Sequence, residues 1–497
     1  MLYLMEKTMV ADRSCASERA THSCRGFHLA LPLSVLALLI GGCMVGPDYT
    51  RQEPEAPQQW HTELQSGLTG SQVGPATLAR WWSVLQDPLL SNLEERAIQA
   101  NLELKEARAR VLEARAMRGL ERAGLFPTLD AEGSATKSRS SESGGTGAER
   151  DLYAVGFDAG WELDVFGGTR RSVEAAQASL EATEADLHDV MVSLLAEVAL
   201  NYLEVRTFQA RLEANQANIK VQQESYDLNL SRYRAGLIAE LTVQESLRIL
   251  MSSSAQIPSL ETGLEAAMNR LAVLLGEPPG GLHMELATQQ PLPVLPPSLA
   301  VGIPAETLRR RPDISRAERT LAAQTARIGI ATAELYPKLQ LSGSLGLEAV
   351  TSGDLFQSTN RTWSVGPRVS WNIFDAGAIR RNIQIQSARQ EQALIRYETT
   401  VLRALEDVEN ALVAYAKEQT RREFLIQASN AATRAGQLAQ DQYRAGLVNY
   451  SHVLDAQRTL YIIKDTQTQS DGAVAANLVR LYKALGGGWQ VSISREN

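Results

Sequence analysis

The sequence predicts an α+β membrane protein that is built as a tandem internal repeat of β-strands and very long helices. Three observations indicate this fold class. Dissimilar marker residues recur at one constant spacing, and two pairs of short segments alternate apolar with small or polar residues. Two stretches without proline, at about 169–234 and 378–444, are far longer than the helices of a globular core.

The repeat is visible in residues that punctuate structure. Four pairs of markers are each separated by 210 positions: Phe126 and Tyr336, Trp161 and Trp371, Arg171 and Arg381, and Tyr233 and Tyr443. Four dissimilar markers in one register are not a chance alignment. The chain is therefore expected to fold as two copies of one plan, at 99–290 and 313–485.

The net charge of the chain bears on which kinds of molecule it can bind. The 497 residues include 49 lysines and arginines and 57 acidic residues, a formal net charge of -8, without a long run of positive residues. Nucleic acid is not expected as a partner, because phosphate backbones are bound by clustered positive charge. An acidic periplasmic or surface protein fits this composition better.

Residues 1–42 are typical of a signal peptide. Scattered basic side chains precede an apolar run from Leu29 to Ile40, which is too short to span a bilayer as a helix, since that takes about 20 residues. Two glycines then precede Cys43, and the pattern resembles a bacterial lipobox. This resemblance implies cleavage before Cys43 and lipidation of Cys43 as the first residue of the mature chain.

Two further features bear on the mature N-terminus. Met44 follows the lipobox cysteine, and in lipobox proteins a residue here that is not acidic permits sorting to the outer membrane. Cys15 and Cys24 lie in the part that would be removed, so no disulfide could form within one mature chain. In the oxidising periplasm, packing and oligomerisation must then stabilise the protein.

Each repeat begins with a helical stretch that ends near a proline. The stretches at about 99–123 and 313–334 are rich in alanine and arginine, and they stop before Pro127 and Pro337, because proline cannot continue a helix. Two strand-like segments follow in each copy, at about 127–139 and 151–165 and at about 337–350 and 362–374.

The strand-like segments alternate in the way that a membrane barrel requires. One face of the third segment carries mainly leucine and the other carries small or polar residues: Leu339, Leu341, Gly343, Leu345 and Leu347 against Gln340, Ser342, Ser344 and Gly346. The segment from Tyr153 to Trp161 alternates likewise. Lipid outside and water inside a barrel produce this period of two. A strand of a soluble β-sandwich alternates in the same way, so only the context separates the two.

The two long stretches predict helices of about 100 Å, at 1.5 Å per residue. Gly236 and Gly446 would end these helices as left-handed caps, and a second helix would return from each turn, at about 240–275 and 449–485. Each copy is therefore expected to contain an antiparallel helical hairpin with an alanine-rich face. A solvent-exposed coiled coil fits the same pattern.

Four strands per chain cannot close a barrel. Known membrane barrels begin at eight strands, and an open edge in lipid leaves backbone groups unpaired. The chain must therefore pool its strands with copies of itself, and cyclic symmetry closes such a ring. Two copies would give an eight-stranded barrel filled by side chains, whereas three would give twelve strands with room for an aqueous lumen.

Several motifs together resemble the TolC-like outer-membrane efflux proteins, in particular the lipidated subgroup that pairs with resistance-nodulation-division pumps. These motifs are the run from Gly42 to Tyr49, Trp81-Trp82 with Asp87-Pro88-Leu89, Arg310 to Ile314 with Ala317-Glu318, and the Tyr-Arg-Ala-Gly turns at Tyr233 and Tyr443. The resemblance covers essentially the whole mature chain. It implies a homotrimer with a twelve-stranded β-barrel continuous with an α-helical periplasmic tunnel, an equatorial girdle, no cofactor and no enzymatic chemistry.

The resemblance also implies a function and a location. The trimer would be the passive exit duct of a tripartite efflux pump in the cell outer membrane, exporting drugs or other small toxic compounds with a periplasmic adaptor protein and an inner-membrane pump.

The chain would then divide into a signal peptide at 1–42, an anchor and equatorial segment at 43–98, repeats at 99–290 and 313–485, a Pro-rich linker at 291–312 and a tail at 486–497. A type I secretion duct, a metal-efflux duct and a non-conducting lipid-anchored scaffold remain alternatives.

The resemblance places a gate near the second turn, at the inner end of the tunnel. Polar and ionic contacts hold this end shut in resembling channels. Three copies of Asp455 around a narrow axis would repel one another, so Arg458, three positions further along the helix, is the expected partner. Ser451 stands where relatives often carry a leucine, which puts an apolar constriction in doubt. The alternative is an ordinary exposed acid and base on a helix.

The two turns are expected to face the adaptor protein. The residues concerned are Arg234, Gly236 and Leu237 in the first turn and Arg444, Gly446 and Leu447 in the second. Glycine allows close backbone approach, and the arginines could bind adaptor carbonyls. Helix capping explains the glycines equally well, but it accounts less well for arginine and leucine.

No catalytic or metal site is expected. The six histidines are scattered, none lies beside a cysteine or a second histidine at ligand spacing, and no nucleophile motif or phosphate loop occurs. Trp81 and Trp82 are expected to be buried in the girdle rather than to act as interfacial anchors. Asp313 is expected to lie near the N-cap of a helix and not in a site.

Overall fold

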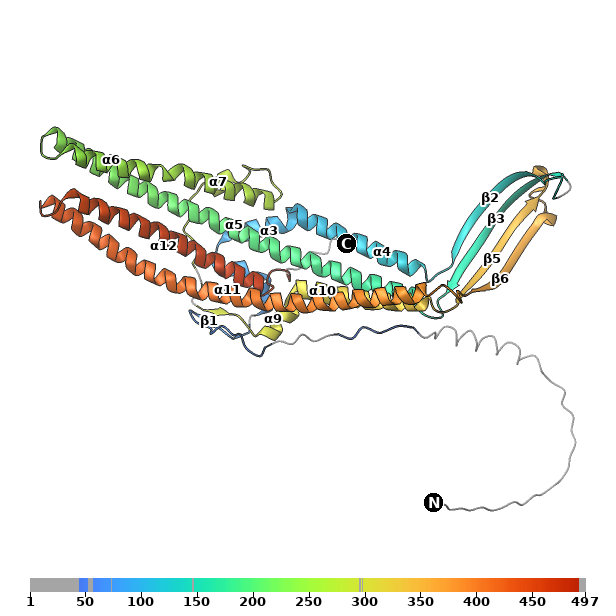
Figure 1. Cartoon of the computed structure of the whole chain (residues 1–497). Helices are drawn as coiled ribbons and strands as arrows, with labels where there is room; N and C mark the ends of the chain where they lie inside the picture. Colours follow the sequence, from blue (N-terminus) through green and yellow to red (C-terminus); the bar gives the residue numbers. More distant parts are fainter. Residues whose placement is uncertain are drawn as a thin grey trace, which may run out of the picture.

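The computed structural model describes residues 44–51, 57–72, 74–144, 147–294, 296 and 298–490. The predicted signal peptide and Cys43 lie outside the described residues. The chain is elongated, with a sheet at one end and the tips of two helical hairpins at the other (Figure 1). Among the helices of the described residues, none combines the length and the hydropathy that a membrane-spanning helix needs.

The two halves fold on one plan. The first contains α4 (Leu102–Ala123), β2 (Thr128–Arg139), β3 (Glu149–Leu163) and α5 (Gly168–Arg234). The second contains α10 (Pro312–Ala333), β5 (Lys338–Ala349), β6 (Arg361–Ser370) and α11 (Ala378–Arg444). The starts of α4 and α10, of β2 and β5, and of α5 and α11 are each 210 residues apart, so the repeat is confirmed.

Equivalent hydrogen bonds recur in the two halves. The indole Nε1 of Trp161 donates to the carbonyl of Leu125 at 3.0 Å, and that of Trp371 donates to the carbonyl of Leu335 at 3.1 Å. Each bond joins the end of the second strand of a repeat, β3 or β6, to the end of the helix that precedes its first strand, α4 or α10. The tryptophan markers of the repeat therefore have a structural reason.

The four strands form one antiparallel sheet in the order β2-β3-β5-β6. Phe157 on β3 lies opposite Ala131 on β2 and Leu345 on β5, and Leu345 lies opposite Trp363 on β6. Directly opposite residues project from the same face of a sheet, so one apolar face continues across all four strands. The predicted alternation is confirmed.

The last strand is shorter than predicted. It ends at Ser370 rather than near 374, because Ser370 pairs with Lys338, the first residue of the neighbouring β5. Pro367, which has no N–H to donate, lies within β6 at the edge of the sheet, where a strand has a neighbour on one side only.

The helices α5 and α11 run through the whole helical part (Figure 1). Near the sheet, α10 packs between them and α4 packs on the far side of α5. Towards the tips, α12 (Tyr450–Ala484) packs between them, and α6 (Glu240–Ser254) and α7 (Gln256–Leu274) pack on the far side of α5. The order is thus α4-α5-α10-α11 near the sheet and α6/α7-α5-α12-α11 near the tips.

Two predicted helices need correction. The return helix expected at 240–275 is interrupted at Ala255, because Pro258 lacks the N–H that would continue the series of backbone bonds. The helix expected from 99 begins only at Leu102, after α3 (Pro88–Ala100). Asn101 separates the two, and its side-chain oxygen accepts from the Leu104 N–H at 2.9 Å as a cap.

A girdle of short elements lies against the middle of the helical part. These elements are β1 (Leu68–Thr69), α2 (Pro75–Ala79), the 3-10 helix η1 (Trp81–Leu85), α3, α8 (His283–Leu286), β4 (Leu299–Ala300) and α9 (Pro304–Arg310). The segment predicted as a Pro-rich linker supplies β4, which pairs in parallel with β1. Trp81 stacks on Tyr482 with ring centroids 5.6 Å apart, and Trp81 and Trp82 are both buried, as predicted.

Candidate functional site

The sheet presents two chemically different faces. On the apolar face Leu345, Trp363 and Val365 are 61%, 74% and 68% exposed in the single chain. The opposite face carries Ser344, whose hydroxyl lies 2.7 Å from that of Ser364 on β6. Large contiguous apolar surface is unfavourable in water. The sheet is therefore built to have an apolar medium on one face and a polar one on the other.

Both flanks of the chain are left without a neighbour. Among the described residues, β2 and β6 each pair on one side only. On the flank that carries β2, helix α4 exposes Leu112 and Leu120 by 62% and 68%. On the flank that carries β6, helix α11 exposes Leu402 and Phe424 by 67% and 66%. A second copy related by rotation about a common axis could pair its β2 with the β6 of the first copy. In a closed ring of such copies, both apolar helix edges of every chain would be covered.

The hairpin tips carry the two turns that the sequence singled out. At the first turn the N–H of Leu237 donates to the carbonyl of Arg232, and the N–H of Gly236 to that of Tyr233, both at 2.9 Å. Leu447 and Gly446 make the same two bonds in the second turn, and both glycines have φ of +73°. This Schellman arrangement confirms the left-handed caps.

The turns leave their predicted contact residues on the surface. Leu237 and Leu447 are 73% and 75% exposed, and Arg234 and Arg444 are exposed beside them. The two tips also touch, because the guanidinium of Arg232 lies 5.2 Å from the centre of the Tyr443 ring. Each chain therefore presents a pair of adjacent turns with apolar side chains pointing into solvent.

The predicted gate residues lie on the first turns of α12 but do not contact one another. Ser451, Asp455 and Arg458 all lie on the solvent side of the helix and are exposed. Within one chain, and among the described residues, no ion pair up to 4.0 Å involves Asp455 or Arg458. The interior side of this helix is instead held by Val453 and Leu454, which are buried against Ile249 and Tyr450. Any pairing of the gate charges must therefore involve another copy or a rearrangement.

The segment 44–51, here called the strap, is held at the joint between the sheet and the helices. The N–H of Val45 donates to the carbonyl of Phe166 at 3.2 Å. Arg171 at the start of α5 donates to the carbonyls of Val45 at 3.1 Å and Gly46 at 3.3 Å, and it pairs with Asp48 at 2.7 Å. The side chain of Arg171 is only 1% exposed, so it is enclosed between the strap and the helices.

The close fit of the strap depends on two glycines. Gly46 has φ of +88°, and a Cβ at this position would lie 2.4 Å from the Cα of Gly329 on α10. A Cβ on Gly329 would meet the side chain of Arg171 at 2.8 Å. Further along, the hydroxyl of Tyr49 donates to Glu318 at 3.1 Å. The backbone of the strap therefore lies in direct contact with the backbone of α10 where the strap crosses the joint.

Sequence reasoning recognised Arg171 only as a marker of the repeat. Its counterpart Arg381 is exposed and bonds Gln384 on its own helix at 2.9 Å. Nothing in the pattern of α5 distinguishes a buried arginine from an exposed one. The available signal was the Gly46-Pro47-Asp48 run, which places a carboxylate beside a glycine and a proline in the segment that contacts Arg171.

The Arg311-Pro312-Asp313 motif starts α10, as predicted, with Arg311 at the cap position and Pro312 in the first turn. The guanidinium of Arg311 pairs with Asp313 at 2.7 Å and Asp407 at 3.0 Å, and donates to the carbonyl of Ala484 at 3.0 Å. It therefore ties the ends of α10 and α12 together. Over the described part of the chain, no group of three or more His, Cys, Asp or Glu side chains is arranged to hold a metal ion.

Comparisons with known proteins agree with this geometry. A family model described as outer membrane efflux protein matches residues 93–277 and 303–487, two stretches that begin and end 210 residues apart. Nodulation protein T from Rhizobium leguminosarum bv. trifolii is 32% identical over 459 residues, covering 91% of this chain and 96% of that protein. Toluene efflux pump outer membrane protein TtgI from Pseudomonas putida is 33% identical over 473 residues, covering 93% and 99%. The solved structure of the outer-membrane channel OprN superposes with a TM-score of 0.85 at 38% identity, covering 90% of this chain and 100% of that chain.

Proposed function

The chain belongs to the outer membrane efflux protein family, and from this premise we propose that three copies form the exit duct of a tripartite efflux pump. The observation that carries the proposal is a two-faced sheet whose edge strands have no partner among the described residues. Lipid suits the apolar face, and neighbouring copies supply the missing strands. The duct lies in the cell outer membrane and extends into the periplasm.

The charges on the inner face support three copies rather than two. Asp130, Asp158 and Glu162 share the face of Ser344, and Arg368 lies opposite Gln340 on the same side. An eight-stranded barrel from two copies would enclose these groups in an interior filled by side chains, where unpaired charge is costly. Twelve strands leave room for water, which solvates the charges and carries the cargo.

Two measurements test the duct directly. Purified protein is expected to scatter light as a trimer and to conduct ions after insertion into planar lipid bilayers. Conductance separates a duct from a non-conducting scaffold with the same helices. A fully folded monomer, or a trimer that inserts without conducting, would contradict the proposal.

The partners follow from the position of the tips. The exposed turns and the sheet lie at opposite ends of the long helices (Figure 1). The turns are therefore the part of the duct that a periplasmic adaptor and an inner-membrane pump would contact. A relative named for toluene efflux supports small toxic compounds as cargo. The duct itself is proposed to act passively, without a cofactor or enzymatic chemistry.

The strap supports a lipid anchor at Cys43. Met44, the next residue, lies against Gly167 at the joint, where an added Cβ would meet Met44 at 2.7 Å. The described chain therefore begins at the joint between the sheet and the helices, which is the level where a barrel built from this sheet would leave the membrane. We expect the lipidated residue to enter the inner surface of the outer membrane at this level.

Replacing Arg171 with alanine is expected to release the strap. The change removes two bonds from a charged group to strap carbonyls, which contribute about 1.5–3 kcal/mol each, and the weaker pair with the exposed Asp48. Trypsin should then cleave after Arg51 about tenfold faster or more, measured by mass spectrometry of timed digests. The matched control is Arg381→Ala, which changes the repeat counterpart. Equal cleavage of the two variants would refute the role of Arg171.

Replacing Asp455 with alanine is expected to make the closed channel leak. Three acidic groups near the axis would be lost together with any ion pairs that they form between copies. Single channels in planar bilayers should show a resting conductance several-fold above wild type, because the weak exposed pairs that hold three copies closed are all lost together. Glu423→Ala, which removes an exposed carboxylate far from the tip, is the control. Unchanged conductance would remove Asp455 from the gate.

A further inference from the structure

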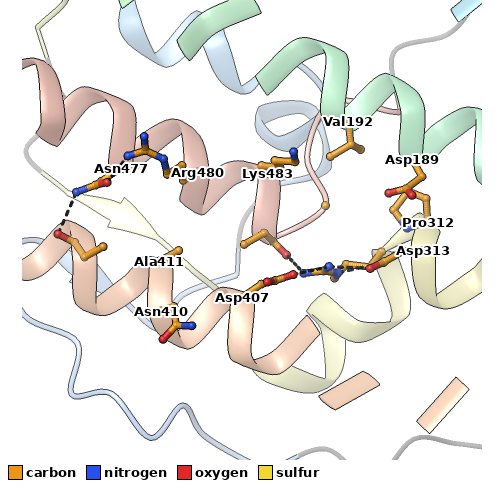
Figure 2. A pocket seen from close by; sticks show the side chains of 14 residues that line it. Asp189, Val192, Pro312, Asp313, Asp407, Asn410, Ala411, Asn477, Arg480 and Lys483 are labelled. Carbon is orange, nitrogen blue, oxygen red and sulfur yellow. Dashed lines mark hydrogen bonds and ion pairs between the residues drawn. The ribbon is translucent and has the colours of Figure 1, made fainter. Parts of the chain in front are cut away.

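A cavity of about 500 Å³ lies in the helical wall, where α12 ends and α10 begins (Figure 2). The two helices meet end to end between α5 and α11, and Arg311 at the start of α10 donates to the carbonyl of Ala484 at the end of α12. Side chains do not interdigitate across such a junction as they do along two parallel helices. The junction therefore leaves a space of the size that small-molecule sites have.

The lining of the cavity combines apolar and charged side chains. Apolar side chains line it from two sides, Val192 on α5 and Ala411 and Ala414 on α11. Two cations of α12, Arg480 and Lys483, also line the cavity (Figure 2). They are three residues apart, so they project from one face of the helix.

The carboxylates of the cavity are already engaged. Asp313 and Asp407 both pair with Arg311, at 2.7 and 3.0 Å. Asp189 pairs with Arg316 at 3.4 Å, and burial raises its pKa from the ordinary value. None of the three is within ion-pair distance of Arg480 or Lys483 among the described residues.

The two cations have no acidic partner within the described part of the chain, where no carboxylate lies within 4.0 Å of Arg480 or Lys483. Arg480 donates to the neutral side-chain oxygen of Asn477, at 2.7 Å. The dipole of α12 favours a cation in its last turn and explains Lys483 in part. It does not explain a second cation one turn earlier beside an open cavity.

We propose that this cavity binds an amphiphilic organic carboxylate. Its carboxylate lies between Arg480 and Lys483, where charge-assisted hydrogen bonds are strong, and its apolar body lies against Val192 and the two alanines. The site is in the middle of the wall, between α5 and α11, so copies that pair along the flanks do not need to cover it. The inference goes beyond the duct and does not depend on conduction.

The test is a binding measurement on the full-length trimer in detergent. The probe is 1-naphthoate, which fits the volume, and the matched neutral probe is 1-naphthamide. Isothermal titration is expected to give naphthoate an affinity about tenfold or more above that of the amide. Lys483→Met and Arg480→Met should each lower the naphthoate affinity about tenfold. Lys464→Met, an exposed position on the same helix, should leave it unchanged.

Three results of the binding measurement would contradict the carboxylate site. Equal affinity for acid and amide, absent binding of naphthoate, or an unaltered affinity in Lys483→Met would overturn the proposal. Light scattering and thermal melting confirm that the variants remain folded trimers, so a loss of binding is not a loss of structure. A trimer that binds naphthoate without conducting would contradict the duct and leave the carboxylate site in place.

Discussion

Replacing Leu345 with arginine is expected to prevent stable insertion of the protein into the outer membrane. Leu345 lies in β5 on the apolar face, between Phe157 and Trp363, and is 61% exposed in the single chain. A charge at the bilayer midplane of a barrel costs about 2–4 kcal/mol per copy, and a ring of three copies incurs this cost three times. That total is comparable with the whole stability of a typical domain, about 5–15 kcal/mol. Membrane fractionation and heat-stable trimers on gels would measure the loss.

The neighbouring residue provides the control. Ser344 lies on the opposite face, beside Ser364, so Ser344→Arg would project into the water-filled lumen. This variant should still reach the membrane as a trimer, with an altered ion selectivity. Trimers of Leu345→Arg that insert as well as those of Ser344→Arg would show that the apolar face does not meet lipid.

Replacing both tip leucines with glutamate is expected to abolish export while trimers persist. Leu237 and Leu447 are 73% and 75% exposed, and neither supports the fold of its own chain. A few residues at the centre of an interface often contribute most of its affinity, and truncation of such a residue costs about 2 kcal/mol or more. Two buried, unpaired carboxylates per chain add a further penalty.

The readout is the drug susceptibility of cells in which this chain is the only exit duct. We expect the glutamate variant to be as susceptible as cells that lack the protein, because adaptor affinity falls about tenfold for each 1.4 kcal/mol lost. The double methionine variant keeps an apolar contact and should export normally. Conductance in bilayers should remain, because the tips are far from the sheet (Figure 1). Full resistance in the glutamate variant would place the adaptor elsewhere.

Local pattern and spacing were enough to predict most of the fold. The constant spacing of markers such as Trp161 and Trp371 identified the duplication, and the alternation around Leu345 identified the face of the sheet. Gly236 and Gly446 located the tips, because few residues other than glycine tolerate positive φ at the end of a helix. These features depend on a few neighbouring residues, so the sequence states them directly.

One helix break and the features that depend on distant packing were missed. Pro258 was not recognised as the cause of a break at Ala255, since a proline near the middle of a helical pattern can either kink or end it. The burial of Arg171 requires the strap to cross α10, and the sequence of α5 alone contains no trace of that crossing. The carboxylate site around Arg480 arises where two helix ends meet, and no local pattern specifies such a meeting.

Duplication within a threefold assembly has a further consequence for the tips. Because the halves are offset by 210 residues, Asp455 and Arg458 have counterparts in Glu245 and Arg248, just after the first turn. Three chains would therefore surround the axis with six nearly equivalent hairpin ends, in two alternating chemical versions. In a pseudo-sixfold opening of this kind, one type of hairpin end can evolve to close the channel and the other to bind the adaptor. A single substitution in the chain then changes three of the six hairpin ends at once.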